Sequence, residues 1–516
     1  MILVYLIGTL IAGGVLTLLV GQWNRSASRW IALITLLINL VAIVSFWIAH
    51  YNNSIGINSW LETYKHDWIP AFGISFHLSI DGLSLIMLAL TFFLGILAVV
   101  CSWKEVTERV GFFHFNLLWI IAGISGVFMA MDLFLFYFFW ELMLIPMYFL
   151  IGIWGSEKRV YAAFKFFLFT QASGLLMLIA IIGIYFIHGK NTGIYTFNYF
   201  ELLGTTINPF TSMWLLLGFM IAFVVKLPIV PFHTWLPDAH SEAPTGGSLI
   251  LAGLLLKTGA YGIIRFALPL FPLAAQVLAP WAMVFGVIGI IYGAILAFAQ
   301  TDLKRLIAYT SVSHMGFVIL GIFTFTELAM QGVVLQIVTH AISTGALFIM
   351  AGMIKERLHT RDIRMMGGLW SFMPKMGALG ILFALASLGL PGLGNFIAEF
   401  LILLGTFSIS IPITIFASMG LIFSTIYSLY FVQKVFLGPS KSEVKMKDFS
   451  LREITIMGLL SIAIFGIGLF PQPIINTSKP MIQHWQKTFS KTTNIFLKTD
   501  KLINPEYSFK KTISKK

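Results

Sequence analysis

The sequence predicts an all-α polytopic membrane protein that crosses the bilayer about fourteen times. Of its 516 residues, 58% are hydrophobic and only 10% are charged, and the mean hydropathy of +0.90 excludes an ordinary soluble globule. The apolar residues also form runs of the ~20 residues that one spanning helix needs, whereas open sheet edges cannot face lipid. The single cysteine, Cys101, excludes disulfides and a cysteine-ligated metal or iron–sulfur centre built from this chain alone.

Each apolar run predicts one span. The first is apolar from its start and lacks a basic leading segment, which favours a permanent span over a cleaved signal peptide. Residues 50–81, between the second and third runs, are expected to form a long loop. In chain order the predicted spans are 2–21, 30–49, 83–101, 111–131, 133–154, 163–187, 212–232, 246–267, 278–300, 305–325, 331–354, 374–405, 411–434 and 454–471.

Positive charge is unequally divided between the two sets of loops. If the N-terminus lies outside, the inward loops hold most Lys and Arg residues, and the outward loops hold only Lys65 and Lys190. Because cytoplasmic loops are enriched in Lys and Arg, this orientation is predicted, in a bacterial inner (cytoplasmic) membrane. The lysine-rich end of the chain would then lie outside. Either it is a tolerated exception, or the helix count is off by one.

Four ionisable side chains lie inside predicted spans: Glu141, Lys226, Lys257 and Glu399. A charge at membrane depth costs about 3 kcal/mol, so such residues usually face a bundle interior or a wet cavity and mark an ion path. We interpret Glu141 and Lys226 as a pair in which a moving carboxylate loads and unloads the lysine. Lys257 would be a central relay and Glu399 the terminal group. The alternative is an inert buried ion pair.

Helix breakers flank two of these residues. Pro228 and Pro231 follow Lys226, and the segment 391–395 (PGLGN) precedes Glu399. Prolines free backbone carbonyls, and interrupted helices in two matching halves indicate an ion site in inverted-repeat transporters. Interrupted helices are therefore predicted near Lys226 and Glu399.

The spacing of the titratable residues suggests an internal repeat. The offset from Glu141 to His314 equals that from Lys226 to Glu399, although coincidence is an alternative. We predict two inverted five-helix repeats. The predicted division is 1–110 (N-terminal transmembrane helices), 111–267 (first repeat), 278–434 (second repeat), 435–475 (cytoplasmic loop and last helix) and 476–516 (basic C-terminal tail).

Two histidines lie in apolar spans beside hydroxyl residues, His314 and His340. Imidazole titrates near physiological pH, so either histidine is a candidate proton relay between Lys257 and Glu399. The alternative for each is a neutral, hydrogen-bonded core histidine.

A second polar cluster lies in the proline-rich segment 231–244, with His233, Asp238 and His240. The spacing fits no zinc motif, so a rigid cytoplasmic entrance loop is predicted here and no metal site. Asp302 is predicted to cap the helix that follows it, as a structural feature. The chain has no nucleotide-binding, haem or flavin motif, so no cofactor is expected on it.

Three segments resemble the antiporter-like subunits of respiratory complex I: VKLPIVPFHTWLPDAHSEAPTGGS (225–248), DLKRLIAYTSVSH (302–314) and LPGLGNFIAEF (390–400). The similarity covers about residues 80–435. The family contains three homologous chains of the complex and subunits of Mrp-type sodium/proton antiporters and of membrane-bound hydrogenases. In it, glutamate at the position of Glu399 is typical of M-type chains, whereas L-type and N-type chains and the antiporters usually carry lysine. The length, and an expected lack of a long horizontal C-terminal helix with an extra anchor, also favour the M type.

The resemblance implies a proton-translocating subunit of an NADH–quinone oxidoreductase. It implies Glu141 and Lys226 as the coupling pair, Lys257 as the central relay, Glu399 as the exit-side carrier, and His314 and His340 in the connecting axis. It further implies a hetero-oligomer with L-like and N-like chains and small membrane subunits in the lipid bilayer, no nucleic acid, and flavin, iron–sulfur clusters and the quinone site on other subunits. An Mrp-type antiporter subunit, a hydrogenase-associated homologue and a membrane scaffold whose buried charges only hold helices together are the alternatives.

Overall fold

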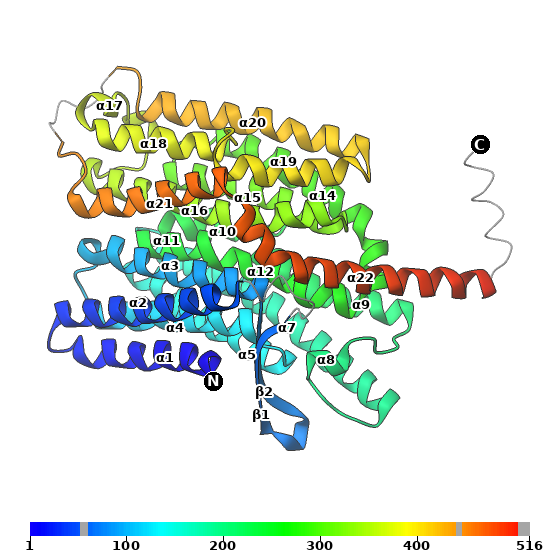
Figure 1. The fold of residues 1–516 in the computed structure, drawn as a ribbon. Coiled ribbons are helices and arrows are strands. Elements are labelled where there is room, and N and C mark those ends of the chain that lie inside the picture. Colours follow the sequence, from blue (N-terminus) through cyan, green and yellow to red (C-terminus); the bar gives the residue numbers. More distant parts are fainter. Residues whose placement is uncertain (52–59, 440–445, 504–516) are drawn as a thin grey trace.

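The computed structural model describes residues 1–51, 60–439 and 446–503, and these form one bundle of mostly parallel and antiparallel helices (Figure 1). In that part of the chain, thirteen helices are long and apolar enough to cross a membrane. The helices are α1 Ile2–Val20, α2 Arg25–His50, α3 Gly82–Glu105, α4 Val110–Met129, α5 Leu133–Leu142, α6 Leu144–Trp154, α7 Arg159–Thr192, α8 Tyr199–Leu202, α9 Pro209–Lys226, α10 Trp235–Glu242, α11 Thr245–Ile250, α12 Leu256–Gly262, α13 Leu268–Leu270, α14 Pro272–Phe298, α15 Leu303–Phe323, α16 Glu327–Leu358, α17 Leu369–Phe372, α18 Pro374–Ser387, α19 Gly394–Phe407, α20 Ile411–Val435, α21 Leu451–Leu469 and α22 Gln472–Ile503.

The predicted all-α membrane fold is confirmed. Two short apolar helices, α18 and α19, lie where the twelfth span was predicted, and the other thirteen predicted spans each coincide with one candidate span. Two π-helical turns, η2 Leu251–Leu255 and η3 Ile263–Ala267, join α11, α12 and α13 into one span that is buried along its whole length. Single turns of 3-10 helix lie at η1 Pro70–Phe72 and η4 Ile363–Met365.

The two predicted helix interruptions are also present. The chain leaves helical geometry between α9 and α10, over residues 227–234, and between α18 and α19, over residues 388–393. Lys226 ends the helix before its break, whereas Glu399 lies in the helix after its break. The equal sequence offset therefore does not place the two residues at the same point relative to the breaks, and the inverted repeat stays a prediction.

A β-hairpin occupies most of the segment that was expected to be a loop. Strand β1 Trp60–Ile69 pairs antiparallel with β2 Ile74–Asp81, and Gly73 closes the turn with a φ of 66°. Strand β2 is almost wholly buried, whereas β1 is mostly exposed or half-buried. The end of the bundle that carries this hairpin is called the hairpin end, and the opposite end, where residues 155–158, 299–302 and 359–373 lie, is called the basic end.

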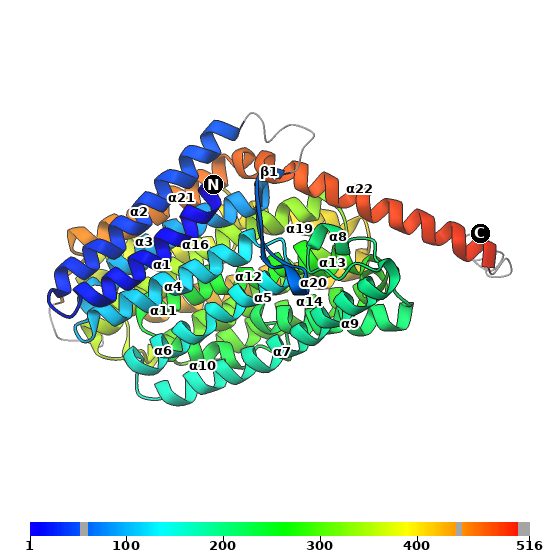
Figure 2. The ribbon, with the colours of Figure 1, turned by 90° about the horizontal axis from the view of Figure 1, so that it is seen from below.

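The predicted basic C-terminal tail is helical over most of its length, because residues 472–503 form the helix α22. Its Met481, Trp485 and Phe489 are buried, and Phe489 stacks on Phe325 at a ring-centroid distance of 4.6 Å. Figure 2 shows α22 crossing the ends of the spans at a steep angle, and its last turns project beyond the bundle in both views. Lysines between these apolar positions concealed the helical pattern. A long C-terminal helix is therefore present, whereas the described residues contain no extra anchoring span after it, and residues 504–516 lie outside the described residues.

The position of α22 also bears on the number of membrane crossings. The Trp47 indole donates to Thr477 Oγ1 at 3.0 Å, and the N-terminal amine lies 3.3 Å from Glu62 of the hairpin. The start of α22 and the N-terminus thus share the hairpin end, as an even number of crossings requires. An even number is reached if α18 and α19 together make one crossing, and the count of fourteen, like the orientation, stays a prediction.

Candidate functional site

The centre of the site is Lys257, which the sequence places in the middle of a fully buried span. Its Nζ lies 2.6 Å from His340 Nδ1 on α16 and donates to the Ala252 carbonyl at 2.9 Å. Ala252 belongs to the π-helical turn η2, in which carbonyls are offset from the usual helical ladder. Local helix geometry therefore supplies one acceptor for the ammonium group, and a neighbouring helix supplies the second.

The second half of the site is built around Glu399 on α19. His314 Nδ1 lies 2.8 Å from Glu399 Oε1, and Gln336 Nε2 donates to the same oxygen at 2.9 Å. On its other side, His314 Nε2 lies 3.2 Å from the Tyr427 hydroxyl and 3.3 Å from Ser387 Oγ. Five helices, α15, α16, α18, α19 and α20, thus contribute to one imidazole–carboxylate pair, with both ring nitrogens in hydrogen bonds.

The two halves of the site adjoin each other at His340 and His314. The rings of His314 and His340 have centroids 5.5 Å apart and lie edge to face. The side chains of Lys257, His340, His314 and Glu399 are each at most 1% exposed. The structure therefore brings four of the predicted residues into one buried line of titratable groups, with both histidines between Lys257 and Glu399.

Glu141 and Lys226 are close but not in contact. Among the described residues no hydrogen bond reaches Lys226 Nζ or Glu141 Oε1. The Lys226 ammonium instead lies 5.0 Å from the ring centroid of Trp140, a cation–π contact, and Glu141 Oε1 lies against Gly174 of α7. The predicted coupling pair is therefore open, meaning that no ion pair joins Glu141 and Lys226 in this structure.

The three residues of the predicted entrance loop have different surroundings. Asp238 is held by two cations, Lys165 Nζ at 2.7 Å and Arg305 Nη1 at 2.8 Å, so it ties α10 to α7 and α15. His240 is fully buried and stacks on Phe348 at 4.4 Å, and neither ring nitrogen has a hydrogen-bond partner among the described residues. His233 packs edge-on against Tyr292 at 5.4 Å. The segment is mostly a buried short helix, not an open loop.

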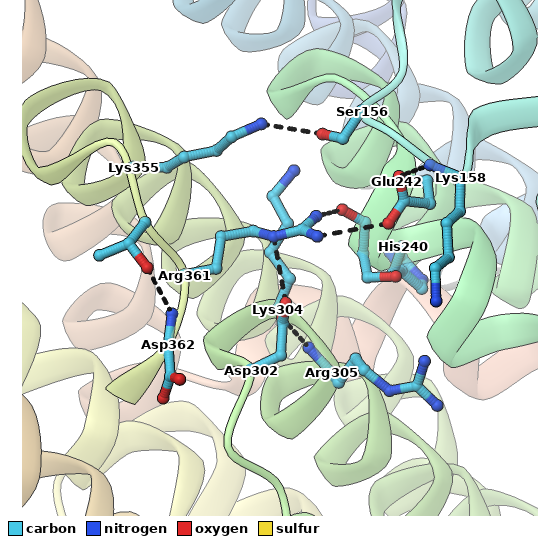
Figure 3. Close-up of polar contacts among 12 residues, drawn as sticks. Ser156, Lys158, His240, Glu242, Asp302, Lys304, Arg305, Lys355, Arg361 and Asp362 are labelled. Carbon is cyan, nitrogen blue, oxygen red and sulfur yellow. Dashed lines mark hydrogen bonds and ion pairs between the residues drawn. The ribbon is translucent and has the colours of Figure 1, made fainter. Parts of the chain in front are cut away.

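A polar cavity of about 810 Å³ opens at the basic end, between the loops that follow α6, α14 and α16. Figure 3 shows its ion pairs: Arg361 reaches Asp302 at 3.1 Å and Glu242 at 3.3 Å, and Lys355 donates to Ser156 Oγ at 2.8 Å. As predicted, Asp302 caps α15 by accepting from the Arg305 amide at 3.0 Å.

Lys304 lies among these groups in Figure 3, yet it is only 2% exposed. Its Nζ donates to the Ala243 carbonyl at 2.8 Å and to Ser248 Oγ at 3.3 Å, and Ser248 Oγ in turn donates to the His240 carbonyl. It is therefore a further buried lysine between the cavity and His240.

Sequence reasoning missed Lys304 because it follows a helix start, where an exposed lysine is ordinary. It also missed Gln336 and Tyr427, since a single polar residue in an apolar span gives no signal of what it faces. Among the described residues, no group of three or more His, Cys, Asp or Glu side chains is placed to hold a metal ion. The expectation of no metal and no cofactor stays a prediction. The arrangement suits proton transfer, because each neighbour in the line can accept or donate a proton.

Comparison with known proteins agrees with this geometry. Residues 130–425 match the family model described as NADH:quinone oxidoreductase/Mrp antiporter, TM. The chain is 52% identical over 500 residues to NADH-quinone oxidoreductase subunit M of Escherichia coli (strain K12), covering 95% of this chain and 98% of that protein. The chain belongs to the subunit M family. The predicted resemblance to M-type chains is thereby confirmed, and the chain is a multi-pass membrane protein of this family.

Two further comparisons support the same family membership. Subunit M of Pseudomonas aeruginosa is 51% identical over 500 residues, covering 94% of this chain and 98% of that protein. A chain in the structure of respiratory complex I from Thermus thermophilus with bound NADH superposes with a TM-score of 0.85 at 30% identity, covering 95% of this chain and all of the other. Both cover nearly the whole chain, so the membership holds for the bundle as a unit.

Proposed function

We propose that this chain is the proton-translocating M-type membrane subunit of an NADH–quinone oxidoreductase. Its family membership and its nearly complete alignment with subunit M proteins support this role. In such a complex the chain sits in a row of membrane subunits as part of a hetero-oligomer. Electron transfer from NADH to quinone, with its flavin and iron–sulfur clusters, belongs to other subunits.

The observation that carries the proposal is the buried line from Lys257 through His340 and His314 to Glu399. A proton that crosses hydrocarbon needs successive groups that change protonation near neutral pH, spaced by a hydrogen bond or a water molecule. Contacts of 2.6 Å and 2.8 Å at the two ends and 5.5 Å between the rings meet that need. A scaffold that only held helices together would not require imidazoles at both inner positions.

We place the proton entrance at the basic end. The cavity there approaches Lys304, which contacts the same short segment as His240, and His240 leads toward Lys257. With the basic loops inside, as the charge distribution favours, this end faces the cytoplasm of a bacterial inner membrane and the N-terminus lies outside. Glu141 and Lys226 act as the coupling pair. When the ion pair between them forms or breaks, the electrostatic field at the buried line of titratable groups changes.

The test is His340→Gln in the intact complex, with assembly checked on native gels. We expect an assembled complex whose NADH-driven proton uptake is lost, because glutamine keeps a polar side chain but cannot relay a proton. His114→Gln is the matched control, since His114 is also fully buried in a span and bonds only its own helix through the Val110 carbonyl at 2.8 Å. Normal pumping by assembled His340→Gln complex would refute the proposed path, and failure of both variants to assemble would favour the scaffold.

A further inference from the structure

A second cavity at the basic end adjoins the first, with Lys355 and His359 in the lining of both. It measures about 350 Å³ and lies where the inner ends of α3, α16 and α21 meet. Its charged lining consists of Lys104, Glu105, Lys355, Glu356 and Arg452, with His359 at its edge. None of the four buried spanning charges or the two relay histidines lines it.

Arg452, in the first turn of α21, is the unusual member of this lining. Its Nε and Nη1 are buried and have no hydrogen-bond partner among the described residues. The nearest carboxylate in sequence, Glu453, is already occupied, because Arg357 binds both of its oxygens at 3.0 Å and 2.9 Å. A buried donor without an acceptor costs about 1–3 kcal/mol, and more for a charged group. The cavity therefore presents a guanidinium that the described protein atoms leave unsatisfied.

The surrounding charges favour an anion. Lys104 is exposed at the end of α3 with no hydrogen bond or ion pair among the described residues, and Lys355 donates only to the neutral Ser156 hydroxyl. The Glu105 carboxylate already has a hydrogen-bond donor, since both of its oxygens accept the Thr245 amide at 3.1 Å. Glu356 offsets one positive charge, so three bases face two acids, and one of those acids is already hydrogen-bonded.

The remaining wall is mostly apolar, and the cavity lies at the ends of three candidate spans, α3, α16 and α21. Ile349 and Met353 line it, and α21 begins beside it with the exposed Leu451 and continues with the exposed Ile462. Basic pockets between membrane helices on the cytoplasmic side bind acidic headgroups, and arginine binds phosphate through two parallel N–H donors.

We propose that this cavity binds a phosphate group, with Arg452 as its principal ligand and Lys104 and Lys355 as supporting cations. The favoured source is an anionic phospholipid, whose acyl chains would lie along the exposed face of α21. The free inorganic anion is the other source of the same chemistry. This inference does not depend on the proton path.

The experiment compares wild-type complex with Arg452→Gln complex after mild delipidation. Bound phospholipids are counted by mass spectrometry, and the temperature of dissociation is measured with phosphatidylglycerol vesicles, phosphatidylcholine vesicles or inorganic phosphate. We expect the wild type to retain an anionic phospholipid that the variant loses, and to be stabilised by phosphatidylglycerol more than the variant is. Arg364→Gln is the matched control, because Arg364 is exposed and pairs with Asp362 at 2.7 Å.

Stabilisation of the wild type by inorganic phosphate alone, absent in the variant, supports the phosphate site and overturns the lipid as its source. Equal lipid retention and equal stabilisation of wild type and Arg452→Gln overturn the site. So does a loss of stability in the variant that no phosphate-bearing probe affects, since a protein carboxylate would then be the partner of Arg452. If Arg452→Gln complex does not assemble, Arg452→Lys, which keeps the charge but lacks the planar fork, is expected to bind the lipid more weakly than wild type. Unchanged binding by Arg452→Lys would also refute the assignment.

Discussion

The variant Lys257→Arg tests whether Lys257 must release a proton or need only carry a positive charge. The native ammonium lies 2.6 Å from His340 Nδ1, so its proton can move to the imidazole and leave a neutral amine behind. Arginine keeps a cation and several donors at this position, but its guanidinium is not deprotonated in proteins. The substitution therefore preserves the local charge while removing the release step.

The magnitude follows from the distance. After the substitution, His340 can be protonated only beside a permanent positive charge. Even if the longer guanidinium lies about 4 Å from the ring, two unit charges at that separation repel by about 4 kcal/mol at an effective dielectric constant of about 20. Since about 1.4 kcal/mol corresponds to a factor of ten, the protonated population of His340 falls by roughly a factor of 10³. Proton flow through this line should fall to the background level.

The assay is NADH-driven proton uptake in membrane vesicles, together with NADH–quinone activity and native gels. The expected result is normal assembly with both activities collapsed, because a blocked relay stalls a coupled complex. Lys190→Arg, the same exchange at an exposed position in the last turn of α7, is expected to behave as wild type. An assembled Lys257→Arg complex that pumps at close to the wild-type rate would show that Lys257 need not release a proton, and the reasoning from the His340 contact would be wrong.

Two further predictions concern stability and coupling. Asp81 forms a buried ion pair with Arg265, so Asp81→Asn, which keeps the helix cap on Ser84, is expected to destabilise the chain by about 3–5 kcal/mol by leaving the guanidinium unpaired. The double variant Asp81→Asn/Arg265→Met should recover much of the loss in thermal dissociation of the complex, and equal stability of the single and double variants contradicts this. Gly174→Ala would place a Cβ 2.6 Å from the Glu141 carboxylate, so pumping should fall in an assembled complex, whereas Gly152→Ala, with its nearest neighbour at 3.6 Å, should pump normally.

The predicted residues that the structure brings together share one property: their chemistry conflicts with their surroundings. A lysine or glutamate in an apolar run has few explanations, so Lys257 and Glu399 could be predicted as members of one path. Their helices were predictable for the same reason, because a run of ~20 apolar residues has one stable form in a membrane. The sequence predicted only that a histidine lies between Lys257 and Glu399, not that His340 contacts Lys257. That contact results from the packing of α16 against a π-helical turn.

Features outside the hydrocarbon were harder to predict. In the hairpin, β1 carries Glu62, Lys65 and Asp67, and its charged alternation resembles that of a solvated loop. In α22, polar residues between the buried apolar positions gave a low average hydropathy, although Trp485 and Phe489 lie on one side of the helix. Both elements are stabilised by contacts with the rest of the bundle, and a local pattern contains no information on such contacts.

The open state of Glu141 and Lys226 has a physical basis in the sequence of α5. Trp140 and Glu141 are consecutive, so the helix offers the Lys226 ammonium two different partners, the face of an indole at 5.0 Å and a carboxylate. A desolvated cation–π contact contributes about 2 kcal/mol, whereas closing a buried ion pair gains more Coulomb energy but also costs the solvation of the carboxylate. The two arrangements can therefore lie within a few kcal/mol of each other. Because Gly174 leaves room beside Glu141, we expect the carboxylate to move between them, and each exchange would change the field acting on the buried lysines further along the line.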